Sequence, residues 1–263
     1  MKQNHLKIRT ALYFVGLFVM TIGIALSVKS NLGVSPVSSI PYTMTCVWGI
    51  EMGKATILFH IGLVILQFLV LRKAFQVKNL LQIVVGVIFG YFTTFCNYLM
   101  TFLPDPSNFG VRLGMMLVSV FLIAFGIFLY VPTDIMPLAG EGAMLAISQV
   151  SGVAFSTIKI IFDCSMVAVS LVTCLVMLHA LGSVGVGTVV AAVLVGTVLM
   201  SVLAAAGFLA APGALALFRR DDAEVIAIGA LALRAQCVVL PLFGVSTVTN
   251  MLLQVTGQSG QAT

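Results

Sequence analysis

The sequence predicts an all-α protein: a polytopic transmembrane helix bundle with an internal, inverted repeat of three spans plus a broken or re-entrant helix. Composition, six long apolar runs and a self-similarity at a constant offset together support this prediction. The 263 residues are 60% hydrophobic and only 8% charged, whereas a soluble domain carries roughly 25% charged residues. A soluble enzyme, a secreted disulfide scaffold and a disordered chain are therefore excluded, and the lipid bilayer is the expected surrounding.

The apolar runs predict six membrane spans, because a spanning helix needs about 20 mostly apolar residues. The first run follows a basic lead and has no small-residue cleavage site, so we expect an uncleaved anchor rather than a signal peptide. In order, the runs are Leu12 to Val28, Ala55 to Leu71, Leu80 to Leu103, Leu113 to Val131, Ile158 to Leu178 and Val184 to Leu209.

Two segments between the runs, Asn31 to Ile50 and Pro132 to Val150, are apolar but interrupted by Pro, Gly and hydroxyl residues. Each forms either a re-entrant half-helix or a short full span. The excess of Lys and Arg on the cytoplasmic side of bacterial membrane proteins favours re-entry, with a cytoplasmic N-terminus in the plasma (inner) membrane. Re-entry leaves Lys29, Lys54 and Arg112 outside and gathers these basic residues inside: Lys2, Lys7, Arg9, Arg72, Lys73, Lys78, Arg219 and Arg220.

An offset of 103 residues aligns one part of the chain with another without gaps. Residues 23–32 match residues 126–135, and the same register matches 57–61 with 160–164. We therefore expect two repeats, at 1–103 and 104–198, followed by a third part at 199–263. Three spans in each repeat invert the second copy, and inverted repeats with broken helices are typical of secondary transporters that bind solute near the midplane.

The interrupted segments supply the expected substrate site, because a broken helix leaves backbone groups and hydroxyls free for a polar ligand. The alternative is that both segments are extramembrane loops in which Pro, Ser and a solvated Glu are ordinary turn residues. The residues of the expected site are Ser35, Pro36, Ser38, Ser39, Pro41, Asp134 and Glu141.

Three ionisable residues lie inside apolar runs, where a charge is costly and often functional. His60 and Asp163 occupy equivalent repeat positions, so a pseudo-two-fold axis would bring them together as an ion- or proton-coupling pair. Lys159 lies four residues before Asp163, on the same helix face. A simple salt bridge between Lys159 and Asp163 is the competing interpretation.

The sequence contains no motif that indicates another functional class. The five cysteines show neither paired nor metal-ligand spacing, and no nucleotide-binding or hydrolytic signature is present. We therefore expect no enzymatic activity, no cofactor and no metal. The basic residues flank apolar runs, which excludes a nucleic-acid surface. The expected partners are the lipid bilayer, a small-molecule or cation substrate, and a second copy in a homo-oligomer.

The segment from Gly23 to Tyr42 resembles the opening of the bacterial YczE/YitT-like family of integral membrane proteins. The resemblance continues through Asp134 and Phe162-Asp163 to the segment from Gly185 to Gly196, about three quarters of the chain. It implies a multi-pass membrane protein and brings no substrate residues with it.

The last part of the chain resembles a piece of the MATE multidrug and toxic-compound extrusion family. The similarity is carried by residues 218–229, 233–237, 240–244 and 250–254, together with Gly257. It implies a helix, a loop and a second helix, without a complete drug pocket. The resemblance places this loop, with Arg219 and Arg220, outside the cell, whereas the repeat places it on the cytoplasmic side. We interpret residues 196–206 as the seam of a mis-joined reading frame or of a genuine fusion.

A secondary transporter of a small solute is the function that these features favour. A non-transporting membrane scaffold or accessory protein is the alternative from a different class, in which the polar residues only pack helices. Xenobiotic:cation antiport is a third reading, which depends on the MATE-like tail.

Overall fold

The fold is an all-α helical bundle, as predicted. A computed structural model describes residues 2–218, 227–228, 230–238 and 241, which contain helices and no strand. Six of these helices are long and apolar enough to cross a membrane: Leu6–Ser30, Met52–Ala74, Val77–Met100, Phe109–Thr133, Phe155–Leu178 and Val186–Pro212.

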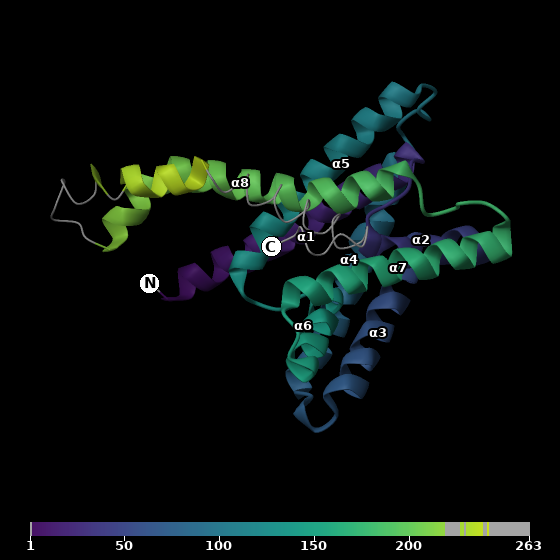
Figure 1. The fold of residues 1–263 in the computed structure, drawn as a ribbon, viewed down its shortest axis with the longest axis horizontal. Coiled ribbons are helices and arrows are strands. Elements are labelled where there is room, and N and C mark those ends of the chain that lie inside the picture. Colours follow the sequence, from purple (N-terminus) through teal and green to yellow (C-terminus); the bar gives the residue numbers. More distant parts are fainter. Residues whose placement is uncertain (1, 219–226, 229, 239–240, 242–263) are drawn as a thin grey trace, which may run out of the picture. The chain divides into compact units, whose positions relative to one another are not determined.

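The helices follow one another in the order seen in Figure 1. They are α1 (Lys2–Ser30), α2 (Pro36–Trp48), α3 (Met52–Leu71), α4 (Leu81–Met100), α5 (Phe109–Tyr130), α6 (Ala139–Ser151), α7 (Phe155–Leu178) and α8 (Val186–Phe218). Three short 3₁₀ helices connect them: η1 (Arg72–Ala74), η2 (Val77–Leu80) and η3 (Val131–Thr133). Two compact units result, Met1–Ala192 and Val193–Thr263, and the candidate site lies in the first.

Helices α1 and α5 run antiparallel along one another. At one end Arg9 Nε donates to the Thr133 carbonyl oxygen at 2.9 Å, and at the other Lys29 pairs with Asp105. The hydrogen bond from Lys29 Nζ, and then the positive charge of Lys29, lower the pKa of the Asp105 carboxyl, which lies in the loop before α5. The two contacts fix the direction and the register of the helix pair.

The offset of 103 residues seen in the sequence recurs in the helix boundaries. Both interrupted segments form 13-residue helices, which start at Pro36 and at Ala139. The residues before them match as well, since Asn31 and Asp134 are left-handed with φ of 51° and 49°. Gly49 and Gly152, with φ of 67° and 71°, end the two helices in the left-handed conformation that glycine adopts without strain.

Contacts between α1 and α5 also come in equivalent pairs. A Cβ placed on Gly23 would lie 2.9 Å from the Ser119 carbonyl oxygen, and one on Gly126 would lie 2.7 Å from the Gly16 carbonyl oxygen. Shifting each residue of the first pair by the repeat offset produces the second. Because the two equivalent helices are antiparallel, the axis that relates them crosses the helices, and the two repeats are inverted.

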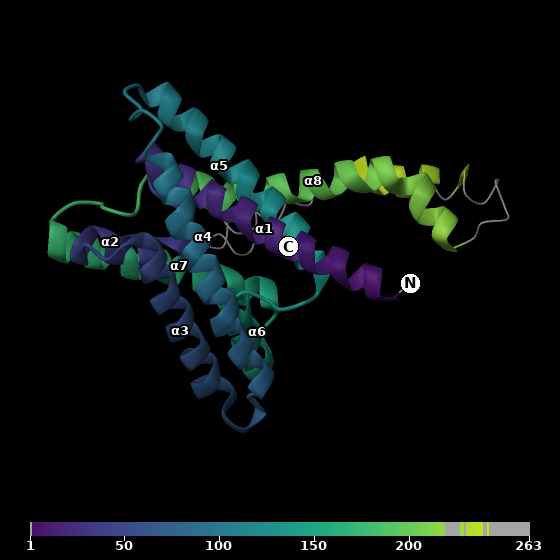
Figure 2. The same cartoon turned by 180° about the vertical axis from the view of Figure 1, so that it is seen from behind.

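Each short helix packs on a long helix of the other repeat. Helix α2 lies along α7, and α6 lies along α3, which forms a hairpin with α4 (Figures 1 and 2). A 13-residue helix is about 20 Å long, whereas the hydrocarbon core is about 30 Å thick. Neither α2 nor α6 can therefore cross the bilayer by itself.

The second unit contains the rest of α8 and a helical stretch at residues 230–238. Here the Arg234 guanidinium lies 5.3 Å from the centre of the Phe208 ring, and its Nε donates to the Phe208 carbonyl oxygen at 3.3 Å. Arg219 and Arg220, which we expected on the cytoplasmic side, and most of the MATE-like segments lie outside the described residues.

The inverted repeat makes a prediction for membrane topology. A cysteine introduced at Asn79, between α3 and α4, and one at Ser107, between α4 and α5, should face opposite sides of the membrane, because α4 is one span. We expect a membrane-impermeant maleimide to label only Ser107→Cys in intact cells and Asn79→Cys only after lysis, in a background without the native cysteines. Labelling of both from the same side would contradict this topology.

Candidate functional site

The first turns of the two short helices meet. A Cβ placed on Gly140, the second residue of α6, would lie 3.7 Å from Val37 Cγ1, on the second residue of α2. Val37 and Gly140 are also equivalent in the repeat. A residue that contacts its own equivalent must lie on the symmetry axis, so the N-terminal ends of both half-helices converge there. We call this place the junction.

The α2 side of the junction has free backbone and hydroxyl groups. Ser35 is the N-cap residue, and its hydroxyl donates to Ser38 Oγ at 3.1 Å instead of capping the helix. Pro41 lies inside α2 and has no N–H with which to pair the Val37 carbonyl. Pro36 has no N–H and the Ser38 N–H donates to the Ser35 carbonyl oxygen at 2.9 Å, so the N–H and carbonyl of Val37 are the polar backbone groups available beside the axis.

Further along α2, a buried hydroxyl cluster fastens the helix to α7. Ser170 donates to Ser39 Oγ at 2.9 Å, and the hydroxyls of Thr43 and Ser183 are 2.6 Å apart. The Cys174 thiol lies 3.7 Å from both Thr43 Oγ1 and Ser183 Oγ. All five side chains are buried. Because each has a partner, the cluster can hold α2 in place without leaving polar atoms unsatisfied.

The α6 side of the junction carries a carboxylate. Glu141, in the first turn of α6, accepts a hydrogen bond from the hydroxyl of Tyr130, whose side chain is 2% exposed. The Tyr13 ring packs edge-on against Tyr130 with centroids 6.0 Å apart, and its hydroxyl donates to the Met136 carbonyl at 2.9 Å. Residues of α1 and α5 thus close around the start of α6.

Two glutamines of the α3–α4 hairpin also hold the start of α6. Gln67 Nε2 donates to Gln82 Oε1 at 2.7 Å and to the Ala139 carbonyl oxygen at 3.1 Å. A Cβ on Gly142 would lie 2.9 Å from Gln67 Oε1. This approach is equivalent, in the repeat, to the Ser39–Ser170 hydrogen bond. The two sides of the junction therefore share one architecture but carry different chemistry: hydroxyls at α2, and a carboxylate with two amides at α6.

Replacing Gln67 with leucine should destabilise the protein, because buried polar groups of Gln82 and Ala139 then lose their partner. An unsatisfied buried group costs about 1–3 kcal/mol, whereas removing both partners together is nearly neutral. We therefore expect Gln67→Leu to lower the thermal unfolding temperature in detergent and Gln67→Leu/Gln82→Leu to recover part of the loss. A double variant that melts below both single variants would rule out this interpretation.

The expected substrate residues fall into two groups. Ser35, Pro36, Ser38, Ser39 and Pro41 all belong to α2 or its cap, and Glu141 belongs to the facing turn of α6, so six of the seven lie at or near the junction. Asp134 does not join them. Its side chain is exposed in the left-handed turn after η3.

The expected coupling residues do not form one cluster. His60 is buried against the Phe89 ring, at 5.5 Å between centroids, and its Nδ1 has no hydrogen-bond partner. Lys159 Nζ lies 2.8 Å from Asp163 Oδ2. No hydrogen bond or ion pair joins His60 to Asp163 in the part of the chain that the structure describes. Their neighbours Leu63 of α3 and Phe162 of α7 belong to one buried hydrophobic cluster.

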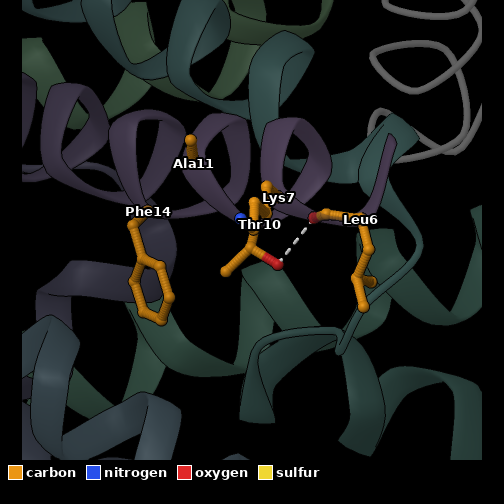
Figure 3. A pocket seen from close by; sticks show the side chains of 5 residues that line it. All are labelled: Leu6, Lys7, Thr10, Ala11 and Phe14. Carbon is orange, nitrogen blue, oxygen red and sulfur yellow. Dashed lines mark hydrogen bonds between the residues drawn. The ribbon is translucent and has the colours of Figure 1, made fainter. Parts of the chain in front are cut away.

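Two surface hollows lie apart from the junction. One is lined by Leu6, Lys7, Thr10, Ala11 and Phe14 of α1 (Figure 3), and the other by Phe68, Leu69, Arg72 and Lys73. Both are open and mostly apolar, with basic side chains at their edges. Neither touches the residues of the candidate site.

Sequence reasoning missed most of the residues that surround Glu141. Arg9, Tyr13, Tyr130 and Gln67 are spaced along three helices, and no local motif joins them. One signal was available in the repeat, since Gln67 and Ser170 are equivalent positions that both contact a half-helix.

Comparisons with known proteins find similarity to one protein family and to a membrane protein. A model for a family of unknown function (DUF6198) matches residues 7–203. Over 155 aligned residues the chain is 28% identical to the uncharacterized membrane protein YczE of Bacillus subtilis (strain 168). The alignment covers 58% of this chain and 68% of that protein. No solved structure matches. These matches support the YczE-like part of the expected resemblance, and the MATE-like part stays a prediction.

Proposed function

We propose that this chain, which belongs to the family of unknown function DUF6198, is a secondary transporter that binds a small solute at the junction of α2 and α6. The observation that carries the proposal is the contact of the two half-helices at Val37 and Gly140, on the axis between inverted repeats. Transporters built from inverted repeats place solute where discontinuous helices meet, and they alternate access by rocking one repeat against the other.

The chemistry of the junction favours a solute with an anionic group. A helix N-terminus presents unpaired N–H groups and the positive end of the helix dipole. The ends of α2 and α6 converge here, and the α2 end contributes the Val37 N–H, because Pro36 has none and that of Ser38 is paired. The hydroxyls of Ser35 and Ser38 lie beside them. The Val37 carbonyl, left without a donor by Pro41, can accept a hydrogen bond from a neighbouring group of the same solute.

A substitution that fills the junction with a larger side chain tests the proposed solute site. Gly140 has room for a methyl group, since the nearest atoms to an added Cβ lie at 3.7 and 3.9 Å. A leucine there would occupy the space between the two first turns. In proteoliposomes given a defined mixture of organic acids, amino acids, inorganic anions and alkylated cations, we expect mass spectrometry to find accumulation of at least one anion with the unmodified protein and none with Gly140→Leu.

Two controls separate occupancy from damage. Gly140→Ala fits and should keep transport, and Gly62→Leu introduces the same side chain on α3 where an added Cβ meets nothing within 4 Å. If the unmodified protein is inserted and monodisperse but accumulates none of the solutes, the result would contradict the proposed transport function and favour the scaffold interpretation. Accumulation of the alkylated cations alone would favour the xenobiotic antiport inferred from the MATE-like tail.

The residues that couple transport to an ion are a separate question. The expected pair of His60 and Asp163 stays a prediction, and transport that is abolished in Asp163→Asn would support it. The ion pair with Lys159, whose side chain is 50% exposed, supports the alternative, in which Lys159 simply neutralises Asp163.

A further inference from the structure

Glu141 differs from the other acidic residues of the described part of the chain. Asp105 and Asp163 are paired with lysines, Glu51 accepts a hydrogen bond from Thr94 on an exposed surface, and Asp134 is exposed. Glu141 is partly buried and has no ion pair within 4 Å; its hydrogen-bond donors are the neutral hydroxyl of Tyr130 and the backbone N–H of Leu138. A carboxylate kept in a membrane protein without a cation partner is a candidate for a task.

We propose that Glu141 takes up and releases the proton that drives the transporter, and that the Tyr130 hydroxyl is its hydrogen-bond donor while it is charged. In the uptake step a hydronium ion of the water phase transfers a proton to the Glu141 carboxylate. One O–H bond of the hydronium ion breaks, one O–H bond forms on Glu141, a water molecule is left, and the negative charge of the carboxylate disappears. The coupling rests on the function proposed above, but the proton exchange itself does not.

The charged groups that face Glu141 leave it free to change its charge. Lys159 of α7 is close enough to act on Glu141 electrostatically, but it is already paired with Asp163, so these three groups sum to one negative charge. Tyr13 and Arg9 of α1 are engaged elsewhere, because they donate hydrogen bonds to the backbone carbonyl oxygens of Met136 and Thr133. The side chains from α3 and α4 beside Gly142 are the neutral Gln67 and Gln82.

Position gives the proton a role in binding. Glu141 directly follows Gly140, so it lies in the same helical turn as the junction. A charged carboxylate there repels an anionic solute, and a protonated one can donate a hydrogen bond to it. Proton and anion should therefore bind together and leave together, which is the linkage that symport requires.

Infrared difference spectroscopy of the reconstituted protein tests the exchange without any solute. Moving from alkaline to acidic buffer should produce the carbonyl stretch of a neutral carboxylic acid. We expect this band to be absent in Glu141→Gln, shifted in frequency in Tyr130→Phe, and unchanged in Asp163→Asn. Size-exclusion profiles check that each variant is folded, and Tyr130→Phe keeps the ring packing against Tyr13.

The outcomes are distinct. A band that survives in Glu141→Gln, or that disappears in Asp163→Asn instead, would overturn the proposal. A band that depends on Glu141, in a protein that accumulates no solute, would leave the proton site standing and remove the transporter. Where an anion is accumulated, Glu141→Gln should make its exchange across the membrane independent of pH and abolish uptake driven by a proton gradient. Uptake that keeps its dependence on the gradient would again overturn the proposal.

Discussion

Replacing Gly126 with leucine is expected to separate α1 from α5 and to cause a large loss of stability. A Cβ on Gly126 would lie 2.7 Å from the Gly16 carbonyl oxygen and 2.8 Å from Met20 Cβ and the Met20 backbone nitrogen. Backbone atoms cannot move aside as a flexible side chain can. Forcing atoms into a packed interior typically costs about 1–3 kcal/mol, and more where backbone must shift, so we expect at least about 3 kcal/mol.

Thermal unfolding in detergent measures this effect. Gly126→Ala should lower the unfolding temperature, because the added Cβ alone already approaches too closely, and Gly126→Leu should lower it further or prevent recovery of folded protein. Gly114→Leu is the matched control on the same helix, since a Cβ there meets nothing within 4 Å. Equal melting of Gly126→Leu and Gly114→Leu would mean that α1 and α5 do not pack as closely as described.

Removing the Arg9 side chain is expected to open the end of the bundle where α1 meets η3. Arg9 donates to the Thr133 carbonyl oxygen, but its repeat equivalent Arg112 donates to the Pro106 carbonyl oxygen in the adjacent loop, at 3.1 Å. The position equivalent to Thr133 is Ser30. The two ends of the molecule are thus held differently, by Arg9 at one end and by the ion pair of Lys29 with Asp105 at the other.

We expect the end that Arg9 bridges to be the more firmly closed one, because the Asp105 side chain of the ion pair at the other end is 92% exposed and exposed ion pairs contribute little. A hydrogen bond from a charged group contributes about 1.5–3 kcal/mol, and since Arg9 is exposed we take the lower value. Arg9→Gln should then raise the population open at this end roughly tenfold. The measurement is the rate at which a maleimide labels Met136→Cys, which should rise in Arg9→Gln and stay unchanged in Arg112→Gln. Equal rates in both variants would exclude the asymmetric closure.

The sequence predicted the helices and the repeat well because both depend on local or periodic properties. Apolar runs mark the spans, although α3 begins at Met52 rather than Ala55, since a polar first turn with Lys54 does not end a helix. The offset of 103 residues depends on side-chain identity alone. It also places Asn31 and Asp134 in matching left-handed turns.

The site was only partly predictable, because it depends on where the axis runs. The approach of Val37 to Gly140 joins two residues with no chemistry to mark them, and the pairing of His60 with Asp163 stays a prediction. Tyr130 and Gln67 reach α6 through tertiary packing. Their partners are 11 and 72 residues away in sequence, beyond any local pattern.

The inverted repeat has a consequence for how the chain enters the membrane during synthesis. Residues 1–103 contain eight lysines and arginines, whereas residues 104–198 contain two, Arg112 and Lys159. Positively charged residues near the ends of spans determine the orientation of the spans in the membrane. The second half therefore has few orientation signals of its own. We therefore expect the first half to set the direction of the second, through the loop between α4 and α5, and the order of synthesis to contribute to the two-fold arrangement.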